Sequence, residues 1–327
     1  MKHAFRKVLC LLLVLTMLIG ILPTGMFAFA ASVAVGDGNV LVDDDFAAAA
    51  NNETVTTTVG DTVYQAVKGV NAFDTINEAL SKVADGGAVY VGAGRYEGGL
   101  TVTANVALYG AGMNINPNTD DWKLNSRRSD LSAESVIVGQ IQVTTKALTK
   151  FVVNGFTFTG QSSIREATSG STIKGVDLCY NRFVNMIDIS STTGAFYFTG
   201  TTVRTGRISY NRVEDAQSAK PVTFRNADNF TFSYNYMNFP GVGIWLTAEI
   251  ADQNVTPGKM LATVVGNYLI GNSPIEIYAA YADAMDVTVS DNIFEGKRRA
   301  MYIAAQEMAN PPRMSYIPAT TSLRKTA

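Results

Sequence analysis

The hexapeptide ISYNRV at residues 208–213 recurs as FSYNYM at residues 232–237. In both, an Asn has an apolar residue three positions before it and another two positions after it. Six segments share this pattern, and successive Asn residues are 27, 30, 24, 32 and 25 residues apart. The six centres are Asn154, Asn181, Asn211, Asn235, Asn267 and Asn292. A chance recurrence of Asn turns in a β-sandwich would not keep both flanking positions apolar, so the repeat favours a solenoid, whose coils bury their faces only against their neighbours.

The repeat also predicts which side chains lie above one another. The Asn side chains should stack as an internal ladder at the strand spacing of roughly 4.8 Å. The strand after each turn alternates, with pairs such as Ile244 and Leu246, or Ile275 and Ile277, pointing inward. Residues between the inward pairs should share one outward face.

A single amphipathic helix is predicted before the repeat. Its apolar residues recur at i, i+3, i+4, i+7 and i+8, beginning at Ile76. Thr75 and Glu78 have the spacing of a capping box, and Gly86 and Gly87 are expected to end the helix. Short strands follow at residues 88–91, 100–102 and 106–109, separated by Gly or Asn turns.

Three segments carry a family resemblance: FDTINEAL at 73–80, AVYVGAGRYE at 88–97 and VALYGAG at 106–112. They resemble the opening of a right-handed parallel β-helix of the pectin lyase-like superfamily, in which an amphipathic helix caps the N-terminal end. The resemblance implies an all-β solenoid of about seven coils over residues 71–305 with an N-terminal capping helix. We expect a signal peptide over 1–30, a linker with an early strand over 31–70, and a C-terminal tail or truncated end over 306–327.

The first thirty residues are ordered as a secretory signal peptide, with a cationic start, an apolar run at 8–22 and small residues at 28–30. The apolar run is shorter than the roughly 20 residues that span a bilayer. We therefore expect a secreted or cell-surface protein whose mature chain does not span a membrane.

The composition of the remaining chain excludes several chemistries. Removing the leader takes away the single His and Cys10, which leaves Cys179 and a mildly acidic net charge. This excludes Ser-His-Asp and Cys-His machinery, His-ligated metals and an intrachain disulfide. The acidic balance also argues against a nucleic-acid partner, which would require a basic patch.

A row of outward residues is the best candidate for a carbohydrate site. Trp245, Glu276 and Tyr302 fall between inward pairs on successive coils, with Arg225 and Tyr278 nearby. Aromatic faces pack on sugar CH groups, while a carboxylate accepts hydroxyl hydrogen bonds. The alternative is that Glu276 is a solvated strand residue.

A second set of outward side chains is predicted beside the Asn ladder. It comprises Tyr180, Tyr210 and Tyr234 before the Asn, and Arg182, Arg212, Tyr236 and Tyr268 after it. Such a column could stack sugar rings or simply stabilise the coils. Cys179 occupies a small-residue position of the repeat, and a long polar insertion at 113–135 could shape a cleft.

No complete catalytic set is present. The esterase and polygalacturonase motifs of the superfamily are missing, so no catalytic residue is assigned and no metal site is predicted. A pectate lyase-like calcium site with a cationic base could use Asp283, Asp286, Asp291 and Glu295 with Lys297 or Arg298. The positions of these carboxylates relative to the repeat Asn, however, place them at different points around the coil. Residues 297–299 otherwise form a basic cluster typical of a solvated turn.

Two hypotheses remain for the function. The first is a secreted protein that binds or acts on polysaccharide along an outward groove, as a pectate lyase-like enzyme or a glycoside hydrolase, with Ca2+ if it is a lyase. The second is a non-catalytic surface solenoid, such as an adhesin, a glycan-binding module or a spacer of a cell-wall-associated protein.

Overall fold

The computed structural model describes most of the chain after residue 30. The described residues are 31–122, 127, 131–145, 147–166, 172–186, 194–199, 204–214, 221–248, 258–280, 282–306, 313–316 and 322–325. The chain divides into two compact units, Met1–Ser32 and Val33–Ala327. The expected signal peptide lies outside the described residues, and the described strands and helices belong to the second unit.

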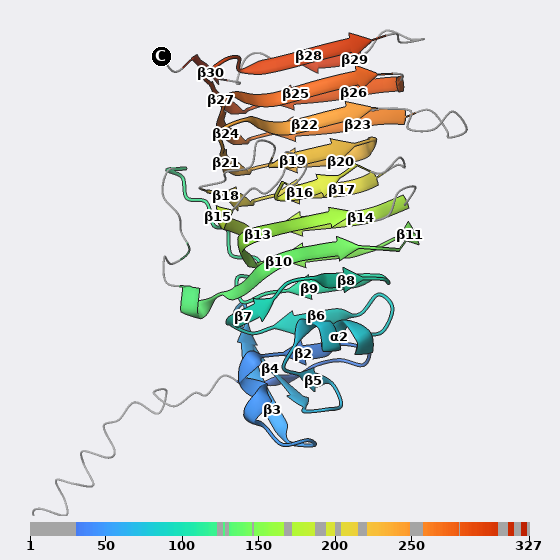
Figure 1. Cartoon of the computed structure of the whole chain (residues 1–327), viewed down its shortest axis with the longest axis vertical. Helices are drawn as coiled ribbons and strands as arrows, with labels where there is room; N and C mark the ends of the chain where they lie inside the picture. Colours follow the sequence, from blue (N-terminus) through green and yellow to red (C-terminus); the bar gives the residue numbers. More distant parts are fainter. Residues whose placement is uncertain are drawn as a thin grey trace, which may run out of the picture. The chain divides into compact units, whose positions relative to one another are not determined.

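The second unit is all-β and solenoid-like. Its strands form a 12-stranded sheet and a 15-stranded sheet, both parallel (Figure 1). Within the described residues the antiparallel pair is the hairpin of β3 (Thr54–Val59) and β4 (Thr62–Val67), which lies in a separate small sheet with β1 (Val33–Ala34). The solenoid expected from the repeat is therefore confirmed at this level.

We call the long path of the 12-stranded sheet face A. From one edge of the sheet to the other, its strands are β5 (Ala72–Phe73), β2 (Val40–Val42), β6 (Ala88–Val91), β9 (Val106–Tyr109), β12 (Phe151–Asn154), β14 (Thr172–Cys179), β17 (Arg204–Ser209), β20 (Ala227–Ser233), β23 (Gly258–Val265), β26 (Ala282–Ser290) and β29 (Arg313–Tyr316). β11 (Ala147–Leu148) pairs with β14 beside this path.

The 15-stranded sheet folds into two faces that meet at β13 (Thr157–Glu166). Face B contains β15 (Arg182–Met186), β18 (Arg212–Val213), β21 (Tyr236–Asn238), β24 (Tyr268–Gly271), β27 (Ile293–Gly296) and β30 (Ser322–Lys325). Face C contains β16 (Phe196–Phe198), β19 (Val222–Arg225), β22 (Val242–Ala248), β25 (Ser273–Ala280) and β28 (Met301–Gln306). β10 (Ser135–Val143) joins β13 to β7 (Gly94–Glu97) and β8 (Leu100–Val102).

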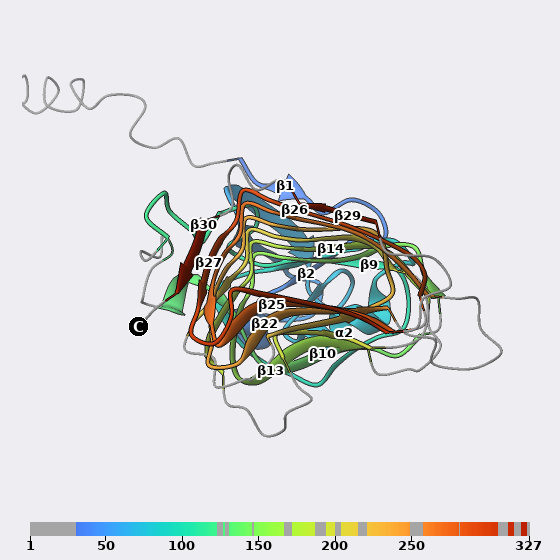
Figure 2. The same ribbon diagram turned by 90° about the horizontal axis from the view of Figure 1, so that it is seen from above.

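The alternating pattern of each strand builds the core between the three faces. Along face C, Phe224, Leu246 and Ile277 stand opposite one another on adjacent strands and are fully buried. Seen from the C-terminal end, the strands of each face lie above one another around this interior (Figure 2). Each coil therefore buries its apolar side chains against the coils before and after it.

The Asn ladder is confirmed from Asn181 to Asn292. Each of Asn181, Asn211, Asn235 and Asn267 donates its backbone and side-chain N–H groups to the side-chain oxygen of the next Asn, over 2.9 to 3.1 Å. All five amides are buried, so the ladder satisfies polar groups that would otherwise lie unpaired inside the turn.

The placement of Asn154 in this ladder is wrong by two residues. Asn154 stands opposite Cys179, and Thr157 stands opposite Arg182, so Phe156 occupies the position equivalent to Asn181. The ladder starts at the backbone N–H of Phe156, which donates to Asn181 Oδ1. Asn154 instead exchanges hydrogen bonds with Asn114.

The predicted helix forms as α2 (Ile76–Lys82). Thr75 is its N-cap, and its hydroxyl accepts a hydrogen bond from the Glu78 N–H. Ile76 and Ala79 are buried, and the helix packs against β2, β5, β6 and β8. The sequence thus predicted the start of the helix, but the helix ends at Lys82, before Gly86 and Gly87, which were expected to end it.

Residues 31–70 hold more structure than a linker with one early strand. They contain β1 to β4 and the 3-10 helix η1 (Asp44–Ala48), and β2 pairs with β6 inside face A. A second 3-10 helix, η2 (Leu131–Ala133), lies near the end of the insertion at 113–135. In the part of the chain that the structure describes, no helix combines the length and apolar character needed to cross a membrane.

Candidate functional site: a polar and aromatic row on face C

Three of the predicted site residues lie side by side on face C. Trp245 on β22 stands opposite Glu276 on β25, and Glu276 stands opposite Tyr302 on β28. Tyr302 is 37% exposed, while Trp245 and Glu276 are half-buried. The strand register therefore places these residues side by side, as the alternation predicted. We call Trp245, Glu276 and Tyr302 the face C row.

Arg299 belongs to the face C row, although the basic cluster at 297–299 was expected to be a solvated turn. Arg299 Nη2 donates to Glu276 Oε1 over 2.8 Å, and its guanidinium carbon lies 3.9 Å from the centre of the Tyr302 ring. The Arg299 side chain therefore joins the carboxylate to the aromatic ring by an ion pair and a cation–π contact.

The turn that carries Arg299 is held by the backbone. The N–H groups of Lys297 and Arg298 donate to the carbonyls of Gly271 and Asn272 in the preceding coil. Gly296 is required here, because a Cβ at this position would lie 2.2 Å from the Arg299 carbonyl oxygen. This fixed turn directs Arg299 toward face C, which the spacing of the sequence did not reveal.

Arg225 is not brought into the face C row. It stands opposite Thr247, two positions along β22 from Trp245, and Thr247 in turn stands opposite Tyr278. Arg225 Nη1 donates to the Thr199 carbonyl over 3.4 Å. Arg225 and Tyr278 therefore belong to a neighbouring row of the same face.

The tyrosines that precede the Asn ladder form a structural stack. The rings of Tyr180, Tyr210 and Tyr234 are 5.2 and 5.0 Å apart and nearly parallel. All three residues have positive φ, and Gly266 follows at the equivalent place, where a Cβ would lie 2.6 Å from the Tyr234 ring. Because the ring faces are used within the stack, this column fits the interpretation that it stabilises the coils.

The residues after the Asn ladder are not an exposed platform, which corrects that expectation. Arg182, Arg212, Tyr236 and Tyr268 are at most 8% exposed. Two described residues of the insertion that was expected to shape a cleft, Asn118 and Trp122, lie over them instead. Asn118 Nδ2 donates to the carbonyls of Asn211 and Tyr234, Arg212 donates to the Trp122 carbonyl over 2.7 Å, and the Trp122 ring meets the edge of Tyr268.

Buried ion pairs anchor this covered column. Arg127 and Glu134 form a two-point salt bridge, with 3% and 7% of their side chains exposed. Glu214 pairs with both Arg182 and Arg212. Burial, and then the neighbouring Arg182, lower the pKa of Arg127 to about 9. Such pairs are costly to break, because removing one partner leaves a buried charge without compensation.

The carboxylates considered for a calcium site do not converge. Asp286 is on face A, opposite Arg313, whereas Glu295 is on face B and accepts a hydrogen bond from the Tyr268 hydroxyl. The Asp283 side chain lies outside the described part. The different positions of these carboxylates relative to the repeat Asn thus correspond to separate faces of the coil.

Within the described residues the carboxylates that cluster closely enough for a metal are Asp43, Asp44 and Asp45, with oxygens within 4.8 Å of one another. Asp43 is buried, which raises its pKa, and it accepts from the Asp45 N–H. Asp44 accepts from the Arg95 N–H. These contacts show that two of the three carboxylates serve the local fold. The cluster directly follows β2, and six strands of face A separate β2 from β23.

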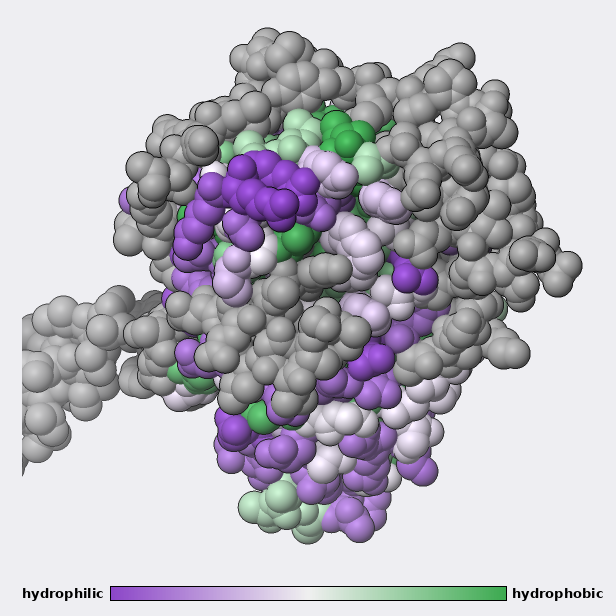
Figure 3. All heavy atoms as spheres, turned by 45° about the horizontal axis from the view of Figure 1, so that its top comes forward, coloured by the Kyte–Doolittle hydropathy of each residue, from purple (hydrophilic) through white to green (hydrophobic). Residues whose placement is uncertain are grey.

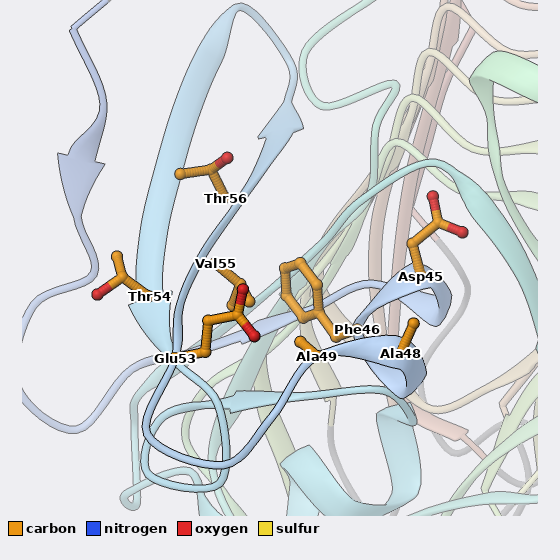
Figure 4. A pocket seen from close by; sticks show the side chains of 8 residues that line it. All are labelled: Asp45, Phe46, Ala48, Ala49, Glu53, Thr54, Val55 and Thr56. Carbon is orange, nitrogen blue, oxygen red and sulfur yellow. The ribbon is translucent and has the colours of Figure 1, made fainter.

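A shallow cavity of about 410 Å³ lies beside this acidic cluster (Figure 4). Phe46, Ala48, Ala49 and Val55 give it apolar walls, and the carboxylates of Asp45 and Glu53 are among its lining groups. It belongs to η1 and β3, at the opposite end of the solenoid from the face C row (Figure 1).

Cys179 is buried, as its small-residue position predicted. Its thiol donates to Asp177 Oδ1 over 2.7 Å, and burial raises its pKa, so it is held as an inert thiol.

Comparisons with protein-family models, with curated proteins and with solved structures each find no match for this chain. The function must therefore be argued from the chemistry of the face C row itself.

Proposed function

We propose that the chain is a secreted or cell-surface right-handed parallel β-helix of the pectin lyase-like kind that binds polysaccharide along the face C row. In this proposal the solenoid has about seven coils and α2 caps its N-terminal end. The fold-level part is supported by three parallel faces, by the Asn ladder, and by the packing of α2 on β2, β5, β6 and β8.

The observation that carries the binding proposal is the strand register of Trp245, Glu276 and Tyr302. Neighbouring strands are roughly 4.8 Å apart, so the two aromatic residues are separated by about 10 Å along the solenoid. A glycan lying along this row would meet an aromatic ring at each end and hydrogen-bonding groups of Glu276 and Arg299 between them. Aromatic rings accept the CH faces of sugars, and these polar groups suit hydroxyls.

Binding without turnover is favoured over lyase or hydrolase activity. Glu276 is engaged by Arg299, and the other residues of the row are aromatic. Cleavage of a glycosidic bond by a pair of carboxylates requires a second one on the opposite side of the bond. The calcium-dependent alternative is weakened because Asp286 and Glu295 lie on different faces.

Calorimetric titration of the purified protein with a panel of neutral and acidic polysaccharides, with and without Ca2+, tests this proposal. For a glycan that binds, Trp245→Ala should raise Kd at least about 10-fold, equivalent to about 1.4 kcal/mol. Tyr234→Ala is the matched control, because Tyr234 is an exposed aromatic residue outside the row, and it should bind as the parent does.

Two outcomes would contradict the proposal. One is that no glycan binds, or that Trp245→Ala and Glu276→Ala bind every ligand as tightly as the parent. The other is release of new reducing ends or unsaturated products that disappears in Glu276→Ala, which would establish an enzyme.

A further inference from the structure

The face C row continues toward the middle of the solenoid. Trp245 stands opposite Thr223 on β19, and Thr223 stands opposite Tyr197 on β16. Tyr197 in turn stands opposite Arg165 on β13. The strands that carry these residues are consecutive in the sheet (Figure 1). We call the whole line the extended row, and its members in order are Arg165, Tyr197, Thr223, Trp245, Glu276 and Tyr302.

The extended row is aromatic on every second strand. Tyr197, Trp245 and Tyr302 lie on β16, β22 and β28. Thr223 and Glu276 lie on the strands between them. Neighbouring strands are roughly 4.8 Å apart, so successive aromatic residues are about 10 Å apart and the outer two about 19 Å apart. The row therefore presents an aromatic side chain at a regular interval of two coils.

The aromatic residues are the accessible members of this repeat. Tyr302 is 37% exposed, and Tyr197 and Trp245 are half-buried. Thr223, which lies between two of them, is only 2% exposed and offers a ligand little surface. A ligand along the row would therefore contact separate aromatic residues rather than a continuous strip.

Cations accompany the aromatic rings at both ends of the row. The guanidinium carbon of Arg165 lies 5.6 Å from the centre of the Tyr197 ring, and that of Arg299 lies 3.9 Å from the centre of the Tyr302 ring. Seen with the C-terminal coils turned forward, strongly hydrophilic atoms lie beside atoms of intermediate hydropathy (Figure 3). Cation–π contacts hold the rings in place, and the guanidinium groups add N–H donors beside them.

We propose that the extended row binds a β-1,4-linked glycan whose chain runs along the solenoid with every second sugar on an aromatic residue. This inference rests on the proposed function and makes its ligand specific. In an extended β-1,4-linked chain each sugar is turned over relative to the one before it, so the same CH face returns at every second sugar. Each sugar advances the chain by about one strand spacing. The repeat of the chain therefore matches the repeat of the rings, which accept such faces. An α-1,4-linked glucose chain curls and loses this register.

Calorimetric titration with oligosaccharides of increasing length tests the match. The ligands are β-1,4-linked oligomers of glucose, of mannose and of N-acetylglucosamine. Affinity for at least one series should rise with length and level off at about five sugars, which cover the row from Tyr197 to Tyr302. The α-1,4-linked glucose hexamer is the matched control ligand, and its Kd should be at least about 10-fold higher than that of the best β-1,4-linked hexamer.

Tyr197→Ala separates the extended row from the shorter face C row. It should raise the Kd of the hexamer about 10-fold, but that of the trimer at most about 2-fold, because Trp245 and Tyr302 still hold the short ligand. Tyr197→Phe keeps the ring and should bind both ligands as the parent does. Tyr278→Ala is the matched control variant, since Tyr278 is an aromatic residue of β25 in the neighbouring row of face C. It should also leave both affinities unchanged.

Four results would overturn this inference alone, while glycan binding that depends on Trp245 still supports the proposed function. They are affinity that stays constant beyond two sugars, full hexamer affinity in Tyr197→Ala, equal affinity for the α-1,4-linked hexamer, and a loss in Tyr278→Ala as large as in Tyr197→Ala. The last would mean that the glycan crosses the row instead of following it. If no glycan binds, the proposed function fails together with the inference. Far-UV circular dichroism verifies that each variant is folded, and the length series decides the matter in the parent protein alone.

Discussion

The two ends of the solenoid bury their last apolar layer differently. At the N-terminal end, Phe73, Ile76 and Ala79 are at most 2% exposed, and α2 packs on the strands there. At the C-terminal end, Ile303 is 42% exposed on an edge strand. A parallel coil buries its interior only against its neighbours, so a terminal coil stays open unless another element covers it. The comparison teaches that the stability contributed by an apolar side chain of this solenoid depends on whether a neighbouring element covers its layer.

The largest expected difference between the ends comes from truncating their apolar side chains. Phe73→Ala should lower the free energy of unfolding by about 3–5 kcal/mol, because it leaves a cavity in the closed core. Ile303→Ala should cost less than about 1 kcal/mol, because much of this side chain already contacts water. Urea unfolding followed by circular dichroism gives both values.

Hydrogen exchange sharpens this comparison by locating each effect. Phe73→Ala should speed amide exchange in β2 and β6, whereas Ile303→Ala should act on β28 and its neighbour β25. Equal losses of stability in the two variants would mean that the C-terminal end is as well covered as the N-terminal end.

The Asn ladder extends from the middle of the solenoid toward its C-terminal coils, so it offers an intermediate test. Asn211→Ala should cost about 2–3 kcal/mol, because it removes the acceptor of the Asn181 backbone N–H and of one Asn181 side-chain N–H, and the amide that donates to the Leu178 carbonyl. Asn292→Ala should cost about 1 kcal/mol less, because its coil adjoins the layer of the exposed Ile303 and can relax.

Asn238→Ala is the control for the ladder, since Asn238 is exposed on β21 and lies outside it. It should leave the urea midpoint within experimental error of the parent. An Asn292→Ala variant as destabilised as Asn211→Ala would show that the ladder is equally tight up to its last Asn.

Much of the face C row could be predicted because it rests on local periodicity. Alternation along single strands places Trp245, Glu276 and Tyr302 outward, and the repeat aligns their strands. Arg299 was missed because its direction depends on backbone bonds from Lys297 and Arg298 to the preceding coil. The burial of Arg212 and Tyr268 was missed because it depends on the distant Trp122.

The misplacement of Asn154 shows a signal that was present but not used. The positive-φ residue of the turn is Gly155 in this coil and Tyr180 in the next, and these two residues are equivalent in the structure. Glycine is the residue that adopts such a conformation most readily. Aligning the coils on this residue, rather than on the Asn, would have placed Phe156 opposite Asn181.

The smallest expected effect concerns the N-cap of α2 at the N-terminal end. Thr75→Ala removes the acceptor for the Glu78 N–H and should cost about 1 kcal/mol. If α2 closes this end, the loss should speed hydrogen exchange in β2 and β8, on which α2 packs, and leave β28 unchanged. Thr58→Ala on β3, an exposed threonine outside any helix, is the control and should change neither. If α2 frays but hydrogen exchange in β2 and β8 matches the parent, the N-terminal strands keep their apolar side chains buried without α2. The contrast between the two ends would then depend on the strands alone.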